Sequence, residues 1–299
     1  MQQTGTECEF DSSDSWVILS PIEQSIKRKI EAVGTPLKDW DIQINYGIKT
    51  GYNDAFIINT EKRDEILSNC QSEDERTRTA ELIRPILRGR DIKRYGYNWA
   101  GQWLIATFPS RHYDIEKYPA VKNYLLSFGI ERLEQTGKEH NVNGEKIKAR
   151  KKTNNKWFET QDSISYWEDF SKPKIIWKRI GSILRFSYDN MEHLGLDSTC
   201  FATGVNIEFV CCVLNSQMGH YLLKDSPKTG TGDLLISVQA IEPIRIPHID
   251  WETNMNFKKL LMDLIKDNSL AKEQEISRKV FELYDLSPNE QSYIEKNFT

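Results

Sequence analysis

Cysteine is scarce in this chain, and the residues present form no pattern. The 299 residues contain five cysteines, at positions 8, 70, 200, 211 and 212. An odd number without a C-x-x-C pair indicates neither a zinc site nor a disulfide framework. Cys211 and Cys212 lie in an apolar stretch of helical character, which favours core packing. This usage predicts a reducing, cytoplasmic setting.

Long hydrophobic runs and familiar catalytic motifs are also missing. The longest apolar runs are far too short to span a bilayer, so no membrane partner is expected. The first fifteen residues are polar and acidic and do not resemble a secretory signal. The five histidines share no metal-ligand spacing, and neither a G-x-S-x-G elbow nor a P-loop occurs. We expect no metal site and no active centre in this chain.

The charge of the chain is weakly acidic overall but strongly uneven. The formal net charge is -4, yet residues 84–156 contain 16 Lys and Arg against 7 Asp and Glu. The stretches before and after this segment are acidic. A basic middle between acidic ends is typical of a localised phosphate-binding face, although a solvated basic surface would leave the same pattern.

The pattern of apolar residues predicts a mixed α/β (α+β) fold, with a small twisted sheet, surrounding helices and a helical C-terminal appendage. Ser20, Pro21 and Glu23 make a strong helix start, and Gly34 ends that helix. Further helices are expected over residues 60–70, with Thr60 as N-cap, and over 74–83, 118–128 and 206–223. Strands are expected over residues 16–19, 55–59, 101–108, 174–179, 183–187, 234–238 and 244–247, and a long exposed loop over 137–155.

Three parts of the chain follow from this pattern. Residues 1–19 are predicted to be a tail or linker, residues 20–250 the main domain, and residues 251–299 a helical segment. Apolar stripes in the last segment, and Ser287 with Pro288 and Glu290 at its last helix start, predict helices that pack on the main domain or on a partner.

The segment GIKTGYNDAF, residues 47–56, is the most informative in the chain. Gly47 and Gly51 permit positive φ and close backbone approach. Lys49, Thr50 and Asn53 then offer donors above the turn, where Lys and Asn suit phosphates or base edges. The alternative is a tight turn with an exposed lysine.

Other cations gather beside glycines and aromatic residues. Arg88 and Arg90 flank Gly89, and residues 146–156 hold six basic residues just before Trp157 and Phe158. The remaining candidates for DNA contact come from that basic segment, from the segment after Trp177 and from a Gly- and Thr-rich loop: Lys148, Arg150, Lys151, Lys152, Lys178, Arg179, Lys228 and Thr229.

Several blocks of the sequence resemble one family in the same order. They are GIKTGYNDAF (47–56), IRPILRGRDIKRY (83–95), YPAVKNYL (118–125), FSKPKIIW (170–177), VLNS (213–216) and IRIP (244–247). Together they are similar to the TaqI-like C-terminal specificity domain, the target-recognition part of adenine-specific DNA methyltransferases and fused type II restriction–modification enzymes.

The resemblance implies a DNA-reading module without chemistry of its own. The family's catalytic signature Asn-Pro-Pro-Tyr and a glycine-rich methyl-donor loop are absent here. The resemblance also implies double-stranded DNA as a partner, together with a separate methyltransferase domain that would bind S-adenosylmethionine, as in a type IIG restriction enzyme. Two alternatives stay open: a protein-interaction module that docks through its helical C-terminus, and a self-contained nuclease.

Overall fold

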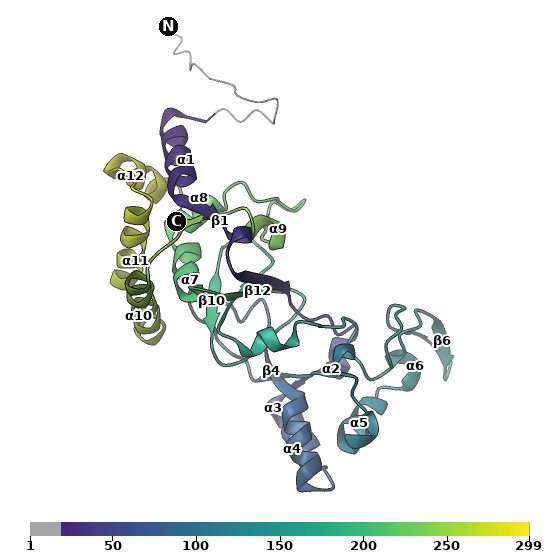
Figure 1. Cartoon of the computed structure of the whole chain (residues 1–299). Helices are drawn as coiled ribbons and strands as arrows, with labels where there is room; N and C mark the ends of the chain where they lie inside the picture. The colour runs from purple at the N-terminus through teal and green to yellow at the C-terminus, as the bar shows by residue number, and fades with distance from the viewer. Residues whose placement is uncertain (1–18, 299) are drawn as a thin grey trace.

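The computed structural model describes residues 19–298, which form a mixed α/β fold with several small sheets (Figure 1). The predicted fold class is therefore confirmed. The strand expected at Trp16 lies almost entirely outside the described residues. Within the described part, no helix is long and apolar enough to cross a membrane.

The terminal lobe, residues 19–46 and 172–298, is built around an antiparallel sheet of order β10-β8-β12-β2. Its strands are β2 (Ile42–Tyr46), β8 (Lys174–Lys178), β10 (Phe186–Asp189) and β12 (Thr199–Gly204). Two short sheets flank it: β1 (Gly34–Pro36) with β14 (Arg245–Pro247), and β9 (Ile180–Gly181) with β13 (Leu234–Leu235).

Helices from both ends of the chain cover this sheet. They are α1 (Pro21–Val33), α7 (Ile207–Asn215), α8 (Gln217–Leu222), α9 (Val238–Ile241), α10 (Trp251–Asp267), α11 (Leu270–Leu283) and α12 (Pro288–Asn297). Ser20 and Glu23 form the expected capping box of α1, and Ser287 and Glu290 form that of α12. The C-terminal helices share one apolar core with α7 and the sheet, so they pack back on the chain itself.

The insert lobe, residues 47–171, packs around a second apolar core, to which the terminal lobe adds Ile176, Leu194, Leu196 and Phe201, and holds a second sheet of order β11-β4-β5-β3. Its strands are β3 (Ile57–Asn59), β4 (Ile83–Leu87), β5 (Gln102–Ile105) and, contributed by the terminal lobe, β11 (Leu194–Gly195). Its helices are α2 (Asn53–Phe56), α3 (Thr60–Ser68), α4 (Glu73–Leu82), α5 (Pro119–Leu126) and α6 (Ile130–Leu133). Short 3-10 helices occur at Leu37–Asp39, Pro109–Arg111, Ile115–Lys117 and Trp167–Ser171.

A buried network of charges lies where the two lobes meet. Lys174 and Asp189 are fully buried, with Nζ 2.6 Å from Oδ2, and His193 Nδ1 lies 3.0 Å from Asp189 Oδ1. Burial alone would raise the pKa of Asp189, but the hydrogen bond from His193 and the charge of Lys174 hold it well below its usual range. Asp189 is the last residue of β10, and β11 begins directly after His193. The network therefore holds the chain in place where it passes from the first sheet to the second.

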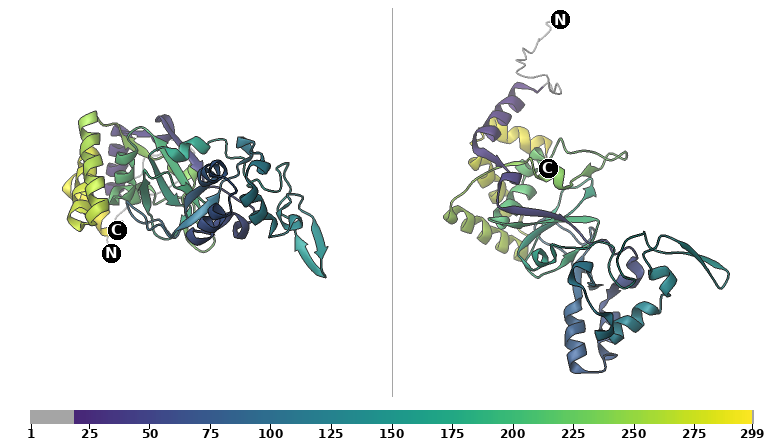
Figure 2. Two further views of the ribbon diagram at one scale, coloured as in Figure 1. Left: turned by 90° about the horizontal axis from the view of Figure 1, so that it is seen from below. Right: turned by 45° about the vertical axis from the view of Figure 1, so that its right-hand side comes forward.

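The prediction of a long loop over residues 137–155 is wrong. Residues 139–148 form a two-stranded ribbon of β6 (Glu139–Val142) and β7 (Glu145–Lys148), which projects from the insert lobe (Figure 2). Asn143 and Gly144 at its tip have φ of 52° and 87°, the pattern of a type I′ turn. The polar strands lack the apolar alternation of a buried sheet, which is why the sequence suggested a loop.

Smaller differences concern the ends of elements. The strand expected at residues 55–59 begins as α2 and becomes extended only at Ile57. Asn59, not Thr60, caps α3, because its side chain accepts the backbone N–H of Lys62. The helix expected at residues 206–223 is broken at Ser216, whose side chain caps α8. Only Leu234–Leu235 of the strand at residues 234–238 is extended, since α9 begins at Val238.

Candidate nucleic-acid interface

The glycine turn after β2 is held by close backbone contact. A Cβ on Gly47 would lie 1.9 Å from the carbonyl oxygen of Leu196, so only glycine fits there. Gly51 has a φ of +81°, as the turn requires. Lys49 is exposed between them, with its backbone N–H donating to Asp162 Oδ2 at 3.2 Å. The turn thus leaves the Lys49 side chain exposed, which is expected under both interpretations of this segment.

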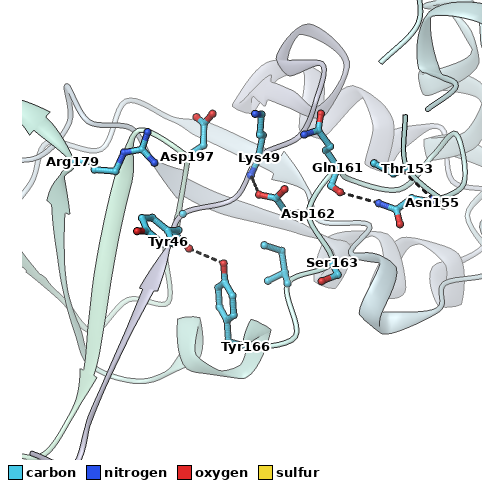
Figure 3. Close-up of a pocket in the computed structure, with 12 residues that line it drawn as sticks. Tyr46, Lys49, Thr153, Asn155, Gln161, Asp162, Ser163, Tyr166, Arg179 and Asp197 are labelled. Atoms are coloured by element: carbon cyan, nitrogen blue, oxygen red, sulfur yellow. Dashed lines mark hydrogen bonds between the residues drawn. The ribbon is translucent and has the colours of Figure 1, made fainter. Parts of the chain in front are cut away.

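An open hollow of about 630 Å³ lies beside this turn (Figure 3). Its wall comes from β2, the glycine turn, residues 153–166, the end of β8 and the turn before β12. The lining residues are Tyr46, Gly47, Lys49, Thr153, Asn155, Gln161, Asp162, Ser163, Ile164, Tyr166, Arg179 and Asp197. Both lobes contribute to it, and the Tyr166 hydroxyl donates to the Tyr46 carbonyl at 2.9 Å across their boundary.

The hollow carries both signs of charge. Lys49 and Arg179 supply the cations, and the Arg179 guanidinium lies 5.8 Å from the centre of the Tyr46 ring. Asp162 and Asp197 supply carboxylates, and burial raises the pKa of Asp162. Cations suit phosphates, whereas carboxylates accept from the amino group of cytosine and disfavour a bare phosphate. A mixed hollow of this kind can hold a phosphate at its cations and a hydrogen-bond donor at its carboxylates.

Lys178 and Arg90 lie close to the same end of the sheet. A Cβ on Gly89 would lie 3.0 Å from Lys178 Cγ, so the exposed lysine runs over the glycine as the two segments meet. Arg90, next in the chain, is exposed. Arg88 is held differently, since its guanidinium forms a two-point pair with Asp91 at 3.0 and 2.9 Å. Of the two arginines that flank Gly89, Arg90 therefore has the side chain that is more accessible to a ligand.

The Gly- and Thr-rich loop lies beside β9. The backbone of Lys228 forms an isolated β-bridge with Leu234. The strand β13 pairs with β9, which begins directly after Arg179. Lys228 is exposed and Thr229 is partly buried, with its hydroxyl 2.8 Å from that of Thr231. This loop and the ribbon project to the same side of the molecule in two views (Figures 1 and 2).

The basic segment 146–156 is divided among three environments. Lys148 is exposed on the ribbon, whereas Lys151 and Lys152 are exposed where the chain returns towards the hollow, whose wall includes Thr153. Lys151 is near enough to Asp162 to lower the pKa of that carboxyl against the effect of burial. Arg150 lies between these lysines but points inward.

The prediction of DNA contact is wrong for two residues, because their side chains are buried. Arg150 is 4% exposed, and its guanidinium donates to the carbonyls of Leu133, Thr50, Glu159 and Trp157. Thr50 is 1% exposed, and its hydroxyl donates to Asn53 Oδ1 at 2.6 Å. Both side chains use their hydrogen-bonding groups inside the fold and are not available to DNA. Asn53 stays exposed, with its oxygen engaged by Thr50.

Sequence reasoning missed much of the hollow's wall. Tyr166, Asn155, Gln161 and the two aspartates were not predicted, because they come from irregular segments without a local motif. Within residues 19–298, no group of three or more His, Cys, Asp or Glu is placed to hold a metal ion. Of the predicted contact residues, Lys49 and Arg179 line the hollow and Lys178 is exposed beside Gly89, whereas Arg88 pairs with Asp91 and Arg150 is buried.

Comparisons with known proteins extend these observations. The family model of the TaqI-like C-terminal specificity domain matches residues 84–244, more than half of the chain. The Gly47–Phe56 segment lies outside that match. No curated protein matches the chain.

Two solved structures are similar to this chain over most of its length. The Type IIL restriction-modification enzyme MmeI, solved in complex with DNA, gives a TM-score of 0.56 at 11% identity over 88% of this chain and 35% of MmeI. The type IIG restriction endonuclease BpuSI gives 0.48 at 13% identity over 88% of this chain and 32% of BpuSI. The chain therefore spans about a third of the length of these proteins.

Proposed function

The chain belongs to the TaqI-like C-terminal specificity domain family, and on that premise we propose that it is a DNA target-recognition module of a restriction–modification adenine-N6 methyltransferase. It binds double-stranded DNA and reads a short sequence in the major groove. Methylation requires a catalytic domain, linked or associated, which flips the adenine and binds S-adenosylmethionine. No residue of this chain is assigned to that chemistry.

One observation carries the proposal above the others. Lys49 and Arg179 come from segments that are distant in sequence, yet they line one hollow, and Lys178, next to Arg179 at the end of β8, lies against Gly89. Among residues 19–298 no ion pair joins these three cations to a carboxylate, so their charge is available to a phosphate backbone. The DNA complex of MmeI, whose fold is similar, gives further support to a DNA partner.

The rival proposal, docking through the helical C-terminus, has weaker support. The apolar stripes of the last helices are already buried in the core, as seen for Phe257, Leu261 and Phe281. Trp251 and Leu270 remain 76% and 69% exposed, but they start two different helices. Met255, one turn after Trp251 on α10, is 41% exposed as well, so the apolar surface left for docking there is a short stripe at the start of that helix.

Salt-dependent binding of a random DNA duplex tests the proposed function. We expect fluorescence anisotropy to give an affinity that falls steeply with salt, since each released phosphate counterion adds about 0.9 to the slope. The Lys49→Ala/Lys178→Ala variant should lose about two contacts and flatten the slope by about 1.8. A matched variant, Lys259→Ala/Lys296→Ala, removes the same charge from exposed positions on α10 and α12 and should keep the slope.

Two outcomes would contradict the proposal. One is the absence of binding at low salt by the unmodified chain. The other is an equal change of slope in the two double variants, because net charge rather than the edge at Lys49 and Lys178 would then control binding.

A further inference from the structure

The ribbon formed by β6 and β7 is a separate structural element whose sequence the fold does not explain. Its strands pair only with each other, in the order β6-β7, and its tip is the exposed Asn143-Gly144 turn. A two-stranded hairpin on its own is marginally stable in water. The described fold therefore gains little from residues 139–148, and the side chains there are free to serve a ligand.

The root of the ribbon, in contrast, is rigid. The pairing continues past the strands, since the Ala149 N–H donates to the Lys138 carbonyl at 2.9 Å and the Gly137 N–H to the Arg150 carbonyl at 2.8 Å. The buried Arg150 then donates to the Thr50 carbonyl at 2.9 Å. This bond ties the ribbon to the glycine turn at the edge of the hollow. The ribbon is thus a projecting arm with a fixed origin beside Lys49.

The two faces of the ribbon differ in character. Successive strand residues point to opposite faces, and the pair His140 and Ile147 is half-buried on one of them. The other face carries Asn141 opposite Lys146, and nearer the root Glu139 opposite Lys148. All four of these side chains are exposed.

We propose that this ribbon enters the major groove of DNA and that Asn141 and Lys146 are specificity-determining residues. The inference rests on the proposed function and deepens it. The major groove admits a two-stranded ribbon, Asn pairs with the N6/N7 edge of adenine, and Lys donates to O6 and N7 of guanine. Because Asn141 is uncharged, it adds little to the salt-dependent part of binding, and its amide offers both a donor and an acceptor to a base edge. The ribbon reads an adenine and a guanine at neighbouring positions.

Selection from duplexes with a randomised central block tests this reading. The unmodified chain should enrich a motif with adjacent adenine and guanine, whereas Asn141→Ala/Lys146→Ala should lose the preference at those positions only. The ratio of motif to random binding should fall roughly ten- to hundredfold in this variant. The control Asn256→Ala/Lys259→Ala, of the same residue types and exposed on α10, should keep the motif. Since the ribbon packs little, urea unfolding midpoints should agree for all three proteins.

A second measurement identifies the groove. Replacing the purines at those positions by their 7-deaza analogues removes the N7 acceptors from the major groove. This should weaken binding by the unmodified chain and leave the ribbon variant unaffected.

The outcomes separate this inference from the proposed function. If no protein binds duplex DNA at low salt, the proposed function fails. If the unmodified chain binds without enriching a motif, or if the ribbon variant enriches the same motif with the same discrimination, DNA binding stands and the reading role of the ribbon is overturned.

Discussion

The Lys174→Met substitution tests the charge network between the lobes. Met is close to Lys in length and apolar, so it fills the fully buried site while removing the charge. It leaves Asp189 buried without its lysine partner, although still in contact with His193, and deprives the Phe170 carbonyl of a donor at 2.7 Å.

The expected loss of stability follows from leaving the buried Asp189 carboxylate without its lysine partner. Removing one partner of a buried ion pair costs about 3–5 kcal/mol, because the remaining charge is no longer compensated. A domain is stable by only about 5–15 kcal/mol. The free energy of unfolding of Lys174→Met should therefore fall by about a fifth or more of its total.

Urea unfolding followed by tryptophan fluorescence measures this loss. The midpoint should fall by about 1 M or more for a urea slope near 3 kcal/mol/M. Lys172→Met is the matched control, since Lys172 lies two positions earlier on the same segment and pairs with Asp169 at the surface. Its midpoint should stay at the value of the unmodified chain. Asp189→Asn removes the other charge, and the double variant should be more stable than the sum of the single effects predicts, by about 1–3 kcal/mol.

A loss below about 1 kcal/mol for Lys174→Met would refute this reasoning, because a surface pair costs as much. Strict additivity of the two substitutions would refute it as well, since the charges would then not depend on each other.

Three further predictions concern other sites. Arg150→Met should lower the free energy of unfolding by several kcal/mol and increase hydrogen exchange at the root of the ribbon, because the Leu133, Thr50 and Trp157 carbonyls lose the donor that Arg150 supplies. Gly47→Ala should prevent stable folding, as its Cβ would overlap a carbonyl oxygen, while Gly230→Ala, with open space around it, should melt like the unmodified chain. Burial lowers the pKa of His220 to about 4, below its unfolded value near 6.5. The unfolded state thus binds the proton first, so stability should fall as pH drops from about 6.5 to 4, and His220→Gln should lack this slope in urea titrations.

The parts of the fold that the sequence predicted depend on local signals. The helix α1 needs only its capping box at Ser20 and Glu23, and the last helix likewise begins at Ser287. The burial of Arg150 does not follow from local signals, because the carbonyls that accept its hydrogen bonds include that of Thr50, one hundred positions away. A basic residue among exposed lysines looks the same in sequence whether it faces solvent or the interior.

The ribbon and the hollow show two further limits of sequence reasoning. Asn143-Gly144 is a strong turn signal, but the strands beside it bury little and so lack apolar alternation. The hollow joins Tyr46, Asp162 and Asp197 from three distant segments. Their meeting depends on how the two cores pack, which no short pattern encodes.

The ends of the insert lobe lie side by side, and this has a consequence for engineering. Asn45 and Asp169 are joined across the boundary by a 3.2 Å hydrogen bond, and Tyr166 bonds to Tyr46. The chain leaves the terminal lobe and returns to it at neighbouring points, with a separate core between. We expect residues 47–171, together with the matching β11, to be exchangeable between homologues as one unit while the rest of the terminal lobe stays constant.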